Sequence, residues 1–268
     1  MIRPDDALLE AVIALAKHAG EEIMAIYDTD YAIEHKEDQT PLTEADMAAH
    51  HLIDAGLREL TPDIPILSEE SANIPFAERQ TWQQYWLVDP LDGTREFIKR
   101  NGEFCVNIAL IDNHDSVLGV IYVPVTKTHY YARQNQGAWR CQDNAAPKRI
   151  HSRSPCPEKP MIAGSRSYRG DSLNAFLAHL GDYEIISMGS AIKSCLVAEG
   201  QCDLYPRLGP TSEWDTAAAH CVVTEAGGQI TDTQMQVLRY NTKDELLNPH
   251  FFVSGDTSRD WAEYLDKD

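Results

Sequence analysis

"WLVDPLDGTREFIKRNGEF", residues 86–104, joins a short apolar segment to two closely spaced carboxylates, Asp89 and Asp92. The segment 86–88 is typical of a buried strand, and Gly93 and Thr94 directly follow the second aspartate. Two carboxylates on one tight turn repel each other unless a positive charge lies between them. The stretch therefore raises the question of a bound metal ion.

The composition is that of a globular protein with ample core. Of 268 residues, 43% are hydrophobic and 24% are charged. The sequence contains no run of about eighteen apolar residues, so no membrane span is predicted. The first ten residues, MIRPDDALLE, do not have the pattern of a secretory signal. The six cysteines form no CxxC pair, which favours reduced thiols over a disulfide framework or a zinc site. We therefore expect a cytoplasmic protein. The sequence decides neither whether it associates peripherally with the inner membrane nor which oligomeric state it has.

The net charge of −19 argues against nucleic acid as a partner. A small anionic substrate is still compatible with this charge, because bound cations reverse the potential locally.

The hydrophobic pattern predicts helices and strands that do not strictly alternate. Helical spacing covers 6–27 and 44–60, and strands are predicted at 86–88, 106–111, 117–123 and 128–134, the last three as an antiparallel meander. The Pro- and Ser-rich segment 151–160 indicates a connection between halves 1–150 and 151–268. The elements predicted after it are strand 160–164, helix 171–180, strand 183–187, helix 190–199, strand 202–206, helix 213–226, strands 228–231 and 251–255, and a helix over 257–265. The pattern favours a layered α+β fold of two packed halves.

Further carboxylates follow other predicted elements. Glu69 and Glu70 follow the apolar segment 64–67, and Asp215 begins the helix in "SEWDTAAAH", residues 212–220. Oxygen ligands of this kind suit Mg²⁺ rather than zinc. A pair of Mg²⁺ ions shares a bridging carboxylate and serves the hydrolysis of phosphate esters.

Each carboxylate also has an ordinary structural explanation. Two glutamates after a strand are typical of a solvated loop, and Asp89–Gly93 has the composition of a common turn. Asp215 can complement a helix dipole, and Thr43 with Asp46 resembles a capping box. Taken one by one, the residues therefore allow a Mg²⁺-dependent phosphatase as a hypothesis but do not distinguish it from these structural explanations.

The ordered set "LTEAD", "SEES", "DPLDGT" and "WDTAAAH" resembles the lithium-sensitive, Mg²⁺-dependent inositol monophosphatase superfamily. The likeness covers nearly the whole chain and implies the α-β-α-β-α sandwich of that superfamily. The stretches "GTREFIKRNGEFCVNIALI" and "SAIKSCLVAEGQCDLYPRLGPTSEWDTAAAH" are similar to bacterial 3′(2′),5′-bisphosphate nucleotidases of sulfur metabolism. Three residues depart from the relatives: Ser68 replaces a frequent Gly, Arg95 a frequent Lys, and Tyr168 a frequent His.

The resemblance implies a cofactor of two or three Mg²⁺ ions and a role for each motif residue. It places Glu69, Asp89 and the Leu91 carbonyl on one ion, and Asp89, Asp92 and Asp215 on another. It makes Thr94 the residue that positions the attacking water, with Asp46 or Glu69 as the base. The implied substrate-binding residues are Leu91, Asp92, Gly93, Thr94, Ser190, Lys193, Arg207 and Asp215.

The implied reaction is removal of the 3′-phosphate of adenosine 3′,5′-bisphosphate, or of 3′-phosphoadenylyl sulfate, by in-line attack of water. Lys193 and Arg207 would contact the nucleotide, although a solvated helix face and a surface ion pair explain them as well. Two interpretations remain for Arg95, Lys99 and Arg100: they lie near the mouth of the site, or they form a basic helix face without a role in binding. Two alternatives remain: an inositol or sugar monophosphatase, and a regulatory binding protein without turnover.

Overall fold

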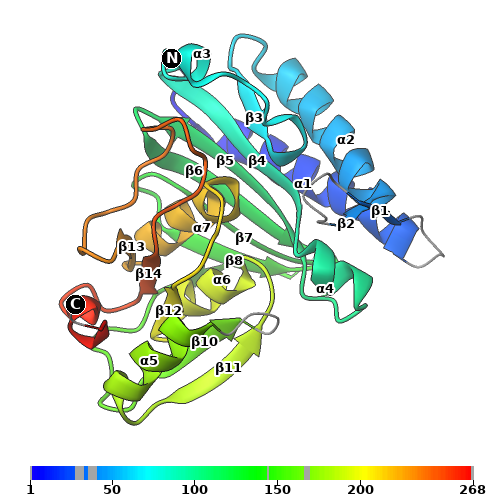
Figure 1. The fold of residues 1–268 in the computed structure, drawn as a ribbon. Coiled ribbons are helices and arrows are strands. Elements are labelled where there is room, and N and C mark those ends of the chain that lie inside the picture. The colour runs from blue at the N-terminus through cyan, green and yellow to red at the C-terminus, as the bar shows by residue number, and fades with distance from the viewer. Residues whose placement is uncertain (1, 28–32, 36–40, 144, 166–169, 267–268) are drawn as a thin grey trace.

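The structure is a computed structural model that describes residues 2–27, 33–35, 41–143, 145–165 and 170–266. Tyr168 lies outside these ranges. The described elements form five layers, helix–sheet–helix–sheet–helix, as Figure 1 shows. This confirms the predicted layered α+β architecture.

A seven-stranded sheet is the larger of the two main sheets. Its strands lie in chain order: β3 (Ile66–Ser68), β4 (Gln84–Asp92), β5 (Cys105–Asp112), β6 (Asp115–Val123), β7 (Thr128–Arg133), β8 (Ala138–Gln142) and β9 (Lys148–Ile150). Only β3 and β4 are parallel among these neighbours; the other pairs are antiparallel. The predicted meander over 106–134 is therefore confirmed, whereas β8 and β9 were not predicted.

Two long helices, α1 (Asp6–Tyr27) and α2 (Glu44–Leu60), cover one face of this sheet. Apolar residues recur along α1 at helical spacing, so Val12, Ala16 and Ile23 all lie buried on its inner side. They pack against Trp86, Val88 and other residues that point to this face from β4, β5 and β6. A two-stranded ribbon of β1 (Ile33–His35) and β2 (Pro41–Thr43) precedes α2.

The second sheet has the strand order β11-β10-β12-β14-β13. Its strands are β10 (Met161–Ser165), β11 (Glu184–Met188), β12 (Leu204–Arg207), β13 (Gln229–Asp232) and β14 (Phe251–Ser254). The helices α6 (Ile192–Ala198) and α7 (Trp214–Glu225) lie between the two sheets, and α5 (Asp171–Leu180) covers the outer face. The two sheets use residues from either side of the 151–160 connection; the division into two domains stays a prediction.

Close packing of α7 on the large sheet depends on Gly119 of β6. A Cβ atom at this position would lie only 2.2 Å from the carbonyl oxygen of Ala218, which is inside van der Waals contact. The absence of a side chain lets the α7 backbone approach the sheet. This contact fixes the height at which the start of α7, and with it Asp215, lies over the strands.

Two predicted elements differ in the structure. The strand predicted at 86–88 continues to Asp92, so the two aspartates lie within β4 and not on a turn after it. The helix predicted over 257–265 is a single 3₁₀ turn, η2 (Trp261–Tyr264). Asp260 caps this turn by accepting a hydrogen bond from the Ala262 N–H, and Trp261 is completely buried in the outer core.

Candidate active site

An irregularity in β4 turns the two aspartates toward one place. Residues at i and i+3 of a regular strand face opposite sides of the sheet. The pairing of β4 with β5 shifts register between Asp89 and Asp92, which is the effect of a bulge. Pro90 lies within this irregular segment and has no N–H to donate to a neighbouring strand. The bulge therefore lets Asp89 and Asp92 serve the same site.

Gly93 ends the strand and starts the short helix α4 (Thr94–Ile98). Its φ of 98° is in the left-handed region, and a Cβ atom would lie 3.1 Å from the carbonyl oxygen of Glu103. A residue with a side chain would be strained here and would shift the neighbouring Asp92 and Thr94.

Three carboxylates converge from two distant parts of the chain. Oxygen atoms of Asp89, Asp92 and Asp215 all lie within 4.8 Å of one another. Glu69, which starts the 3₁₀ turn η1 (Glu69–Ser71) after β3, lines the same cavity of about 420 Å³, as does Leu91. The structure thus brings together all five predicted metal-ligating residues.

Backbone and side-chain donors hold one oxygen of each clustered aspartate. Asp89 Oδ1 accepts from the Leu91 N–H at 3.1 Å, and Asp215 Oδ2 accepts from the Ser212 N–H at 2.9 Å. Asp92 Oδ2 accepts from the Ala191 N–H at 2.5 Å and from the Asn107 amide at 3.3 Å. These hydrogen bonds fix the orientation of the three carboxylates. Each of them uses only one of the two oxygens of its carboxylate.

The cluster is electrostatically unfavourable without a cation. Burial raises the pKa of Asp89 well above its ordinary value, and the charges of Glu69, Asp92 and Asp215 raise it further. Burial, followed by the charge of Asp92, raises the pKa of Asp215 to about 7. Burial also raises the pKa of Asp92, although Lys193 and the Ala191 N–H oppose this. An all-oxygen donor set under such repulsion fits a hard divalent cation.

Thr94 lies at the edge of the acidic cavity. Its hydroxyl is 3.5 Å from Asp46 Oδ2 and 3.4 Å from the carbonyl oxygen of Leu91. Asp46 is only 1% exposed and comes from the first turn of α2. Thr94 and Asp46, two of the predicted catalytic residues, are thus in long contact, and the Asp46 carboxylate is shielded from solvent.

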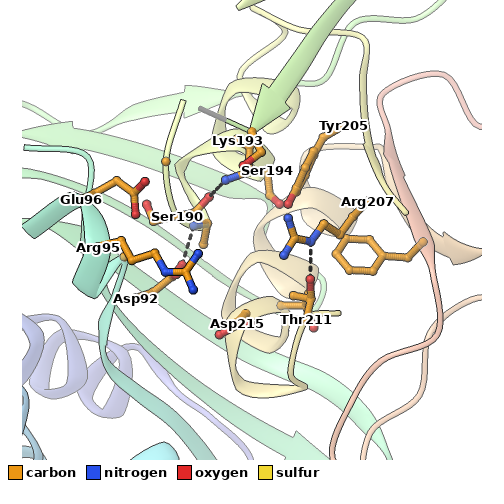
Figure 2. A pocket seen from close by; sticks show the side chains of 16 residues that line it. Asp92, Arg95, Glu96, Ser190, Lys193, Ser194, Tyr205, Arg207, Thr211 and Asp215 are labelled. Atoms are coloured by element: carbon orange, nitrogen blue, oxygen red, sulfur yellow. Dashed lines mark hydrogen bonds between the residues drawn. The ribbon is translucent and has the colours of Figure 1, made fainter. Parts of the chain in front are cut away.

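A second cavity of about 170 Å³ opens beside the acidic one. Figure 2 shows Ser190, Lys193, Tyr205 and Arg207 around it, with Asp92 and Asp215 at the boundary. Lys193 Nζ donates to the carbonyl oxygen of Ser190 at 2.6 Å and lies 5.1 Å from the centre of the Tyr205 ring. Arg207 Nη2 donates to the carbonyl oxygen of Pro210 at 2.7 Å. The predicted nucleotide-contacting residues therefore share one cavity.

The sequence motifs do not single out several of the lining residues: Glu96, Ser165, Ser194, Tyr205, Thr211 and Phe251. Asn107, which supports Asp92, was also missed. Its position on β5 opposite Asp89 is set by strand register, which the sequence alone does not reveal. Arg95 lines both cavities, whereas Lys99 and Arg100 are not among the described lining residues.

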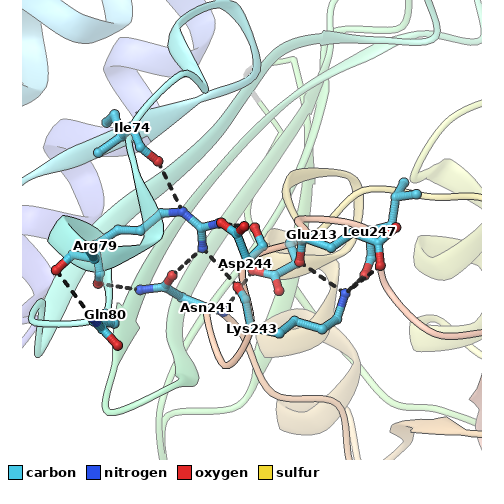
Figure 3. A network of polar contacts seen from close by, with 10 residues as sticks. Ile74, Arg79, Gln80, Glu213, Asn241, Lys243, Asp244 and Leu247 are labelled. Atoms are coloured by element: carbon cyan, nitrogen blue, oxygen red, sulfur yellow. Dashed lines mark hydrogen bonds and ion pairs between the residues drawn. The ribbon is translucent and has the colours of Figure 1, made fainter.

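A polar network ties the segment after Glu69 to the start of α7, as Figure 3 shows. Arg79, at the end of helix α3 (Phe76–Arg79), donates to Asn241 Oδ1 at 2.6 Å and to the carbonyl oxygen of Lys243 at 3.1 Å. The Asn241 N–H donates to Glu213 Oε2 at 2.8 Å. Glu213 is two residues before Asp215, so the network links the two sides of the acidic cavity.

The profile of the inositol monophosphatase family matches residues 5–263. The chain belongs to this family. It is 51% identical, over 92% of its length and 99% of the relative's, to "3′(2′),5′-bisphosphate nucleotidase CysQ" of Salmonella typhimurium. A solved structure of CysQ from Bacteroides thetaiotaomicron is 42% identical with a TM-score of 0.82, covering 93% of this chain and 97% of that one.

Other members of the family share the fold at lower identity. The inositol monophosphatase of Anabaena matches at a TM-score of 0.78 and 25% identity, over 96% of this chain and 94% of that one. The acidic cavity agrees with the divalent-metal chemistry of the family. Within the described part of the chain, no helix is long and apolar enough to cross a membrane.

Proposed function

We propose that this protein is a Mg²⁺-dependent 3′(2′),5′-bisphosphate nucleotidase that converts adenosine 3′,5′-bisphosphate to adenosine 5′-monophosphate and phosphate. The observation that carries the proposal is an acidic cavity that shares lining residues with a second cavity, whose wall includes cationic side chains. Relatives at 38–51% identity that carry the name 3′(2′),5′-bisphosphate nucleotidase support it. The phosphosulfate analogue, 3′-phosphoadenylyl sulfate, is a second substrate of the same chemistry.

The proposed metal ligands are Glu69, Asp89, Asp92, Asp215 and the carbonyl oxygen of Leu91. Asp89 would be shared between two ions, because its carboxylate is buried and lies within 4.8 Å of the carboxylates of both Asp92 and Asp215. When bound, Mg²⁺ ions would stabilise charge on the phosphoryl oxygens and on the departing oxygen, and make a nearby water more acidic.

Thr94 is the proposed positioning group for the attacking water. Its hydroxyl can donate to Asp46 Oδ2, 3.5 Å away, and so present a lone pair to a proton of the water. The water oxygen forms a bond to phosphorus while the bond from phosphorus to the 3′ oxygen breaks, and the departing 3′ oxygen takes up a proton from solvent. The proton released passes to a carboxylate, with Asp46, through Thr94, and Glu69 as the two candidates. The Gly93 backbone would lie against the phosphate.

The second cavity is proposed to hold the nucleotide. Ser190, Lys193 and Arg207 line it, and the contacts of Lys193 with Ser190 and of Arg207 with Pro210 hold these cations in place before substrate arrives. Groups fixed in advance lose little conformational entropy on binding, which favours affinity and specificity. The role in sulfur metabolism would be removal of the bisphosphate nucleotide that sulfate transfer leaves behind.

The experiment that tests the proposal compares phosphate release from adenosine 3′,5′-bisphosphate and from inositol 1-phosphate, with Mg²⁺ and with EDTA. We expect kcat/KM to favour the nucleotide by at least about a hundredfold, since only the nucleotide reaches the second cavity, and turnover to vanish in EDTA. A preference for inositol 1-phosphate would support an inositol or sugar monophosphatase. No turnover of either substrate would support a non-catalytic binding protein.

A further inference from the structure

The acidic cavity and the second cavity share a boundary that contains two cationic side chains. The side chains and backbone common to both linings are Asp92, Gly93, Arg95, Glu96, Arg207 and Asp215. A nucleotide whose 3′-phosphate lies among the carboxylates must pass this boundary to place its remaining parts in the second cavity. Its other phosphate then needs a cationic partner near the boundary.

The cations around the second cavity differ in how far they are already engaged. Lys193 is only 5% exposed and donates to the carbonyl oxygen of Ser190. Arg207 donates through Nε to the Thr211 hydroxyl and through Nη2 to the carbonyl oxygen of Pro210. These contacts fix both side chains as parts of the cavity wall.

Arg95 is different. It is exposed, and across the described ranges its side chain makes no hydrogen bond or ion pair. Figure 2 shows its guanidinium turned from α4 toward the cavity that Asp92 and Ser190 also line. A guanidinium carries five N–H donors in a planar fork that matches phosphate oxygens in pairs. Arg95 therefore has its full donor set available where the two cavities meet.

We propose that Arg95 is a specificity-determining residue that binds the non-scissile phosphate of the substrate, an inference that rests on the proposed function. The 5′-phosphate is common to adenosine 3′,5′-bisphosphate and to its phosphosulfate analogue, so Arg95 serves both. The carboxylates of Asp92, Glu96 and Asp215 share the boundary and would repel this phosphate. A cation that can move to meet the phosphate offsets that repulsion, whereas an uncharged side chain does not.

The test compares Arg95→Gln with wild type on adenosine 3′,5′-bisphosphate and on adenosine 3′-monophosphate, which lacks the 5′-phosphate. A charged hydrogen-bonded contact is worth about 1.5–3 kcal/mol, so we expect kcat/KM for the bisphosphate to fall roughly ten- to hundredfold. The value for the monophosphate should change by less than about twofold. Arg95→Lys should recover part of the loss, because it restores the charge without the fork.

Lys99→Gln is the matched control. Lys99 is exposed at the end of the same short helix and is not among the described lining residues, so its loss changes the net charge equally. We expect it to leave both substrates unaffected. An equal loss with both substrates in Arg95→Gln, or an equal effect of Lys99→Gln, would overturn the role of Arg95 while the proposed function stands. If wild type released no phosphate from the bisphosphate, the proposed function and this inference would fall together.

Discussion

Replacing Asp89 by Asn should abolish activity and, at the same time, stabilise the metal-free protein. Asp89 is the proposed bridging ligand, and the neutral amide removes one negative charge from the middle of the cluster. The Leu91 N–H can still donate to the amide oxygen, so the local hydrogen bond is kept. Mutating a residue that hydrogen-bonds to a metal ligand typically lowers metal affinity or activity by about ten- to a hundredfold. Because Asp89 is itself a proposed ligand, we expect kcat/KM to fall by more than about a hundredfold.

The size of the stabilisation follows from the spacing of the carboxylates. Oxygens of Asp89, Asp92 and Asp215 lie within 4.8 Å of one another. Two unit charges at that distance repel by about 3 kcal/mol at an effective dielectric constant of 20. Because the cluster can bind protons to relieve part of this repulsion, we expect Asp89→Asn to raise the free energy of unfolding by about 1–3 kcal/mol at pH 8.

The pH dependence has a definite sign. The pKa of Asp215 is raised to about 7 in the folded state, above its ordinary value of 3.8. The folded protein therefore holds more protons than the unfolded chain between these two pH values, and this group makes the metal-free protein less stable as pH rises through them. At pH 4 the folded cluster is mostly protonated, whereas the unfolded carboxyls, close to their ordinary pKa, are only about half protonated. The difference between Asp89→Asn and wild type should therefore be small at pH 4 and largest at pH 8.

The assay is urea unfolding of both proteins in EDTA at pH 4 and pH 8, repeated at pH 8 with Mg²⁺. Mg²⁺ should stabilise wild type by about 2–3 kcal/mol at a hundredfold excess over its Kd, and the variant much less. A metal-free variant that is less stable than wild type at pH 8 would refute carboxylate repulsion as the source of the effect. Equal stabilisation of both proteins by Mg²⁺ would also refute it.

Three further predictions concern catalysis, ion selectivity and the polar network. Thr94→Val should lower kcat about a hundredfold or more on bisphosphate and monophosphate alike, because the attacking water is common to both; a loss confined to one substrate would contradict its role. Li⁺ should inhibit more strongly than Na⁺ at equal ionic strength, as the family resemblance implies, whereas equal inhibition would indicate charge screening instead. Asn241→Ala should destabilise the fold by about 1–3 kcal/mol and raise the Mg²⁺ concentration for half-maximal rate. The control Arg140→Gln, which removes an ion pair with Glu199, should not shift that Mg²⁺ concentration.

Local sequence patterns predicted much of the fold. The bounds of α1 and α2 match the predicted ranges because their apolar residues repeat at helical spacing along one buried face. The strands β8 and β9 were missed, although both are antiparallel members of the large sheet. Residues 148–150 have only Ile150 buried, so their strand comes from pairing with β8 and not from an apolar pattern.

The candidate site was predicted from motifs, but its geometry was not. The motif order indicated that Glu69, Asp89 and Asp215 belong together, whereas their approach depends on α7 packing over Gly119. The bulge that turns Asp89 and Asp92 to one site requires the register with β5, which a single strand does not specify. For the same reason, Asn107 could not be singled out.

The most direct test of the metal assignment is anomalous X-ray diffraction from crystals grown with Mn²⁺ in place of Mg²⁺, together with adenosine 5′-monophosphate and phosphate. We expect at least two manganese peaks that share Asp89, each within about 2.5 Å of one of its oxygens, with Asp215 on one of the two ions. A single peak, or peaks that leave Asp89 without a metal contact, would contradict it.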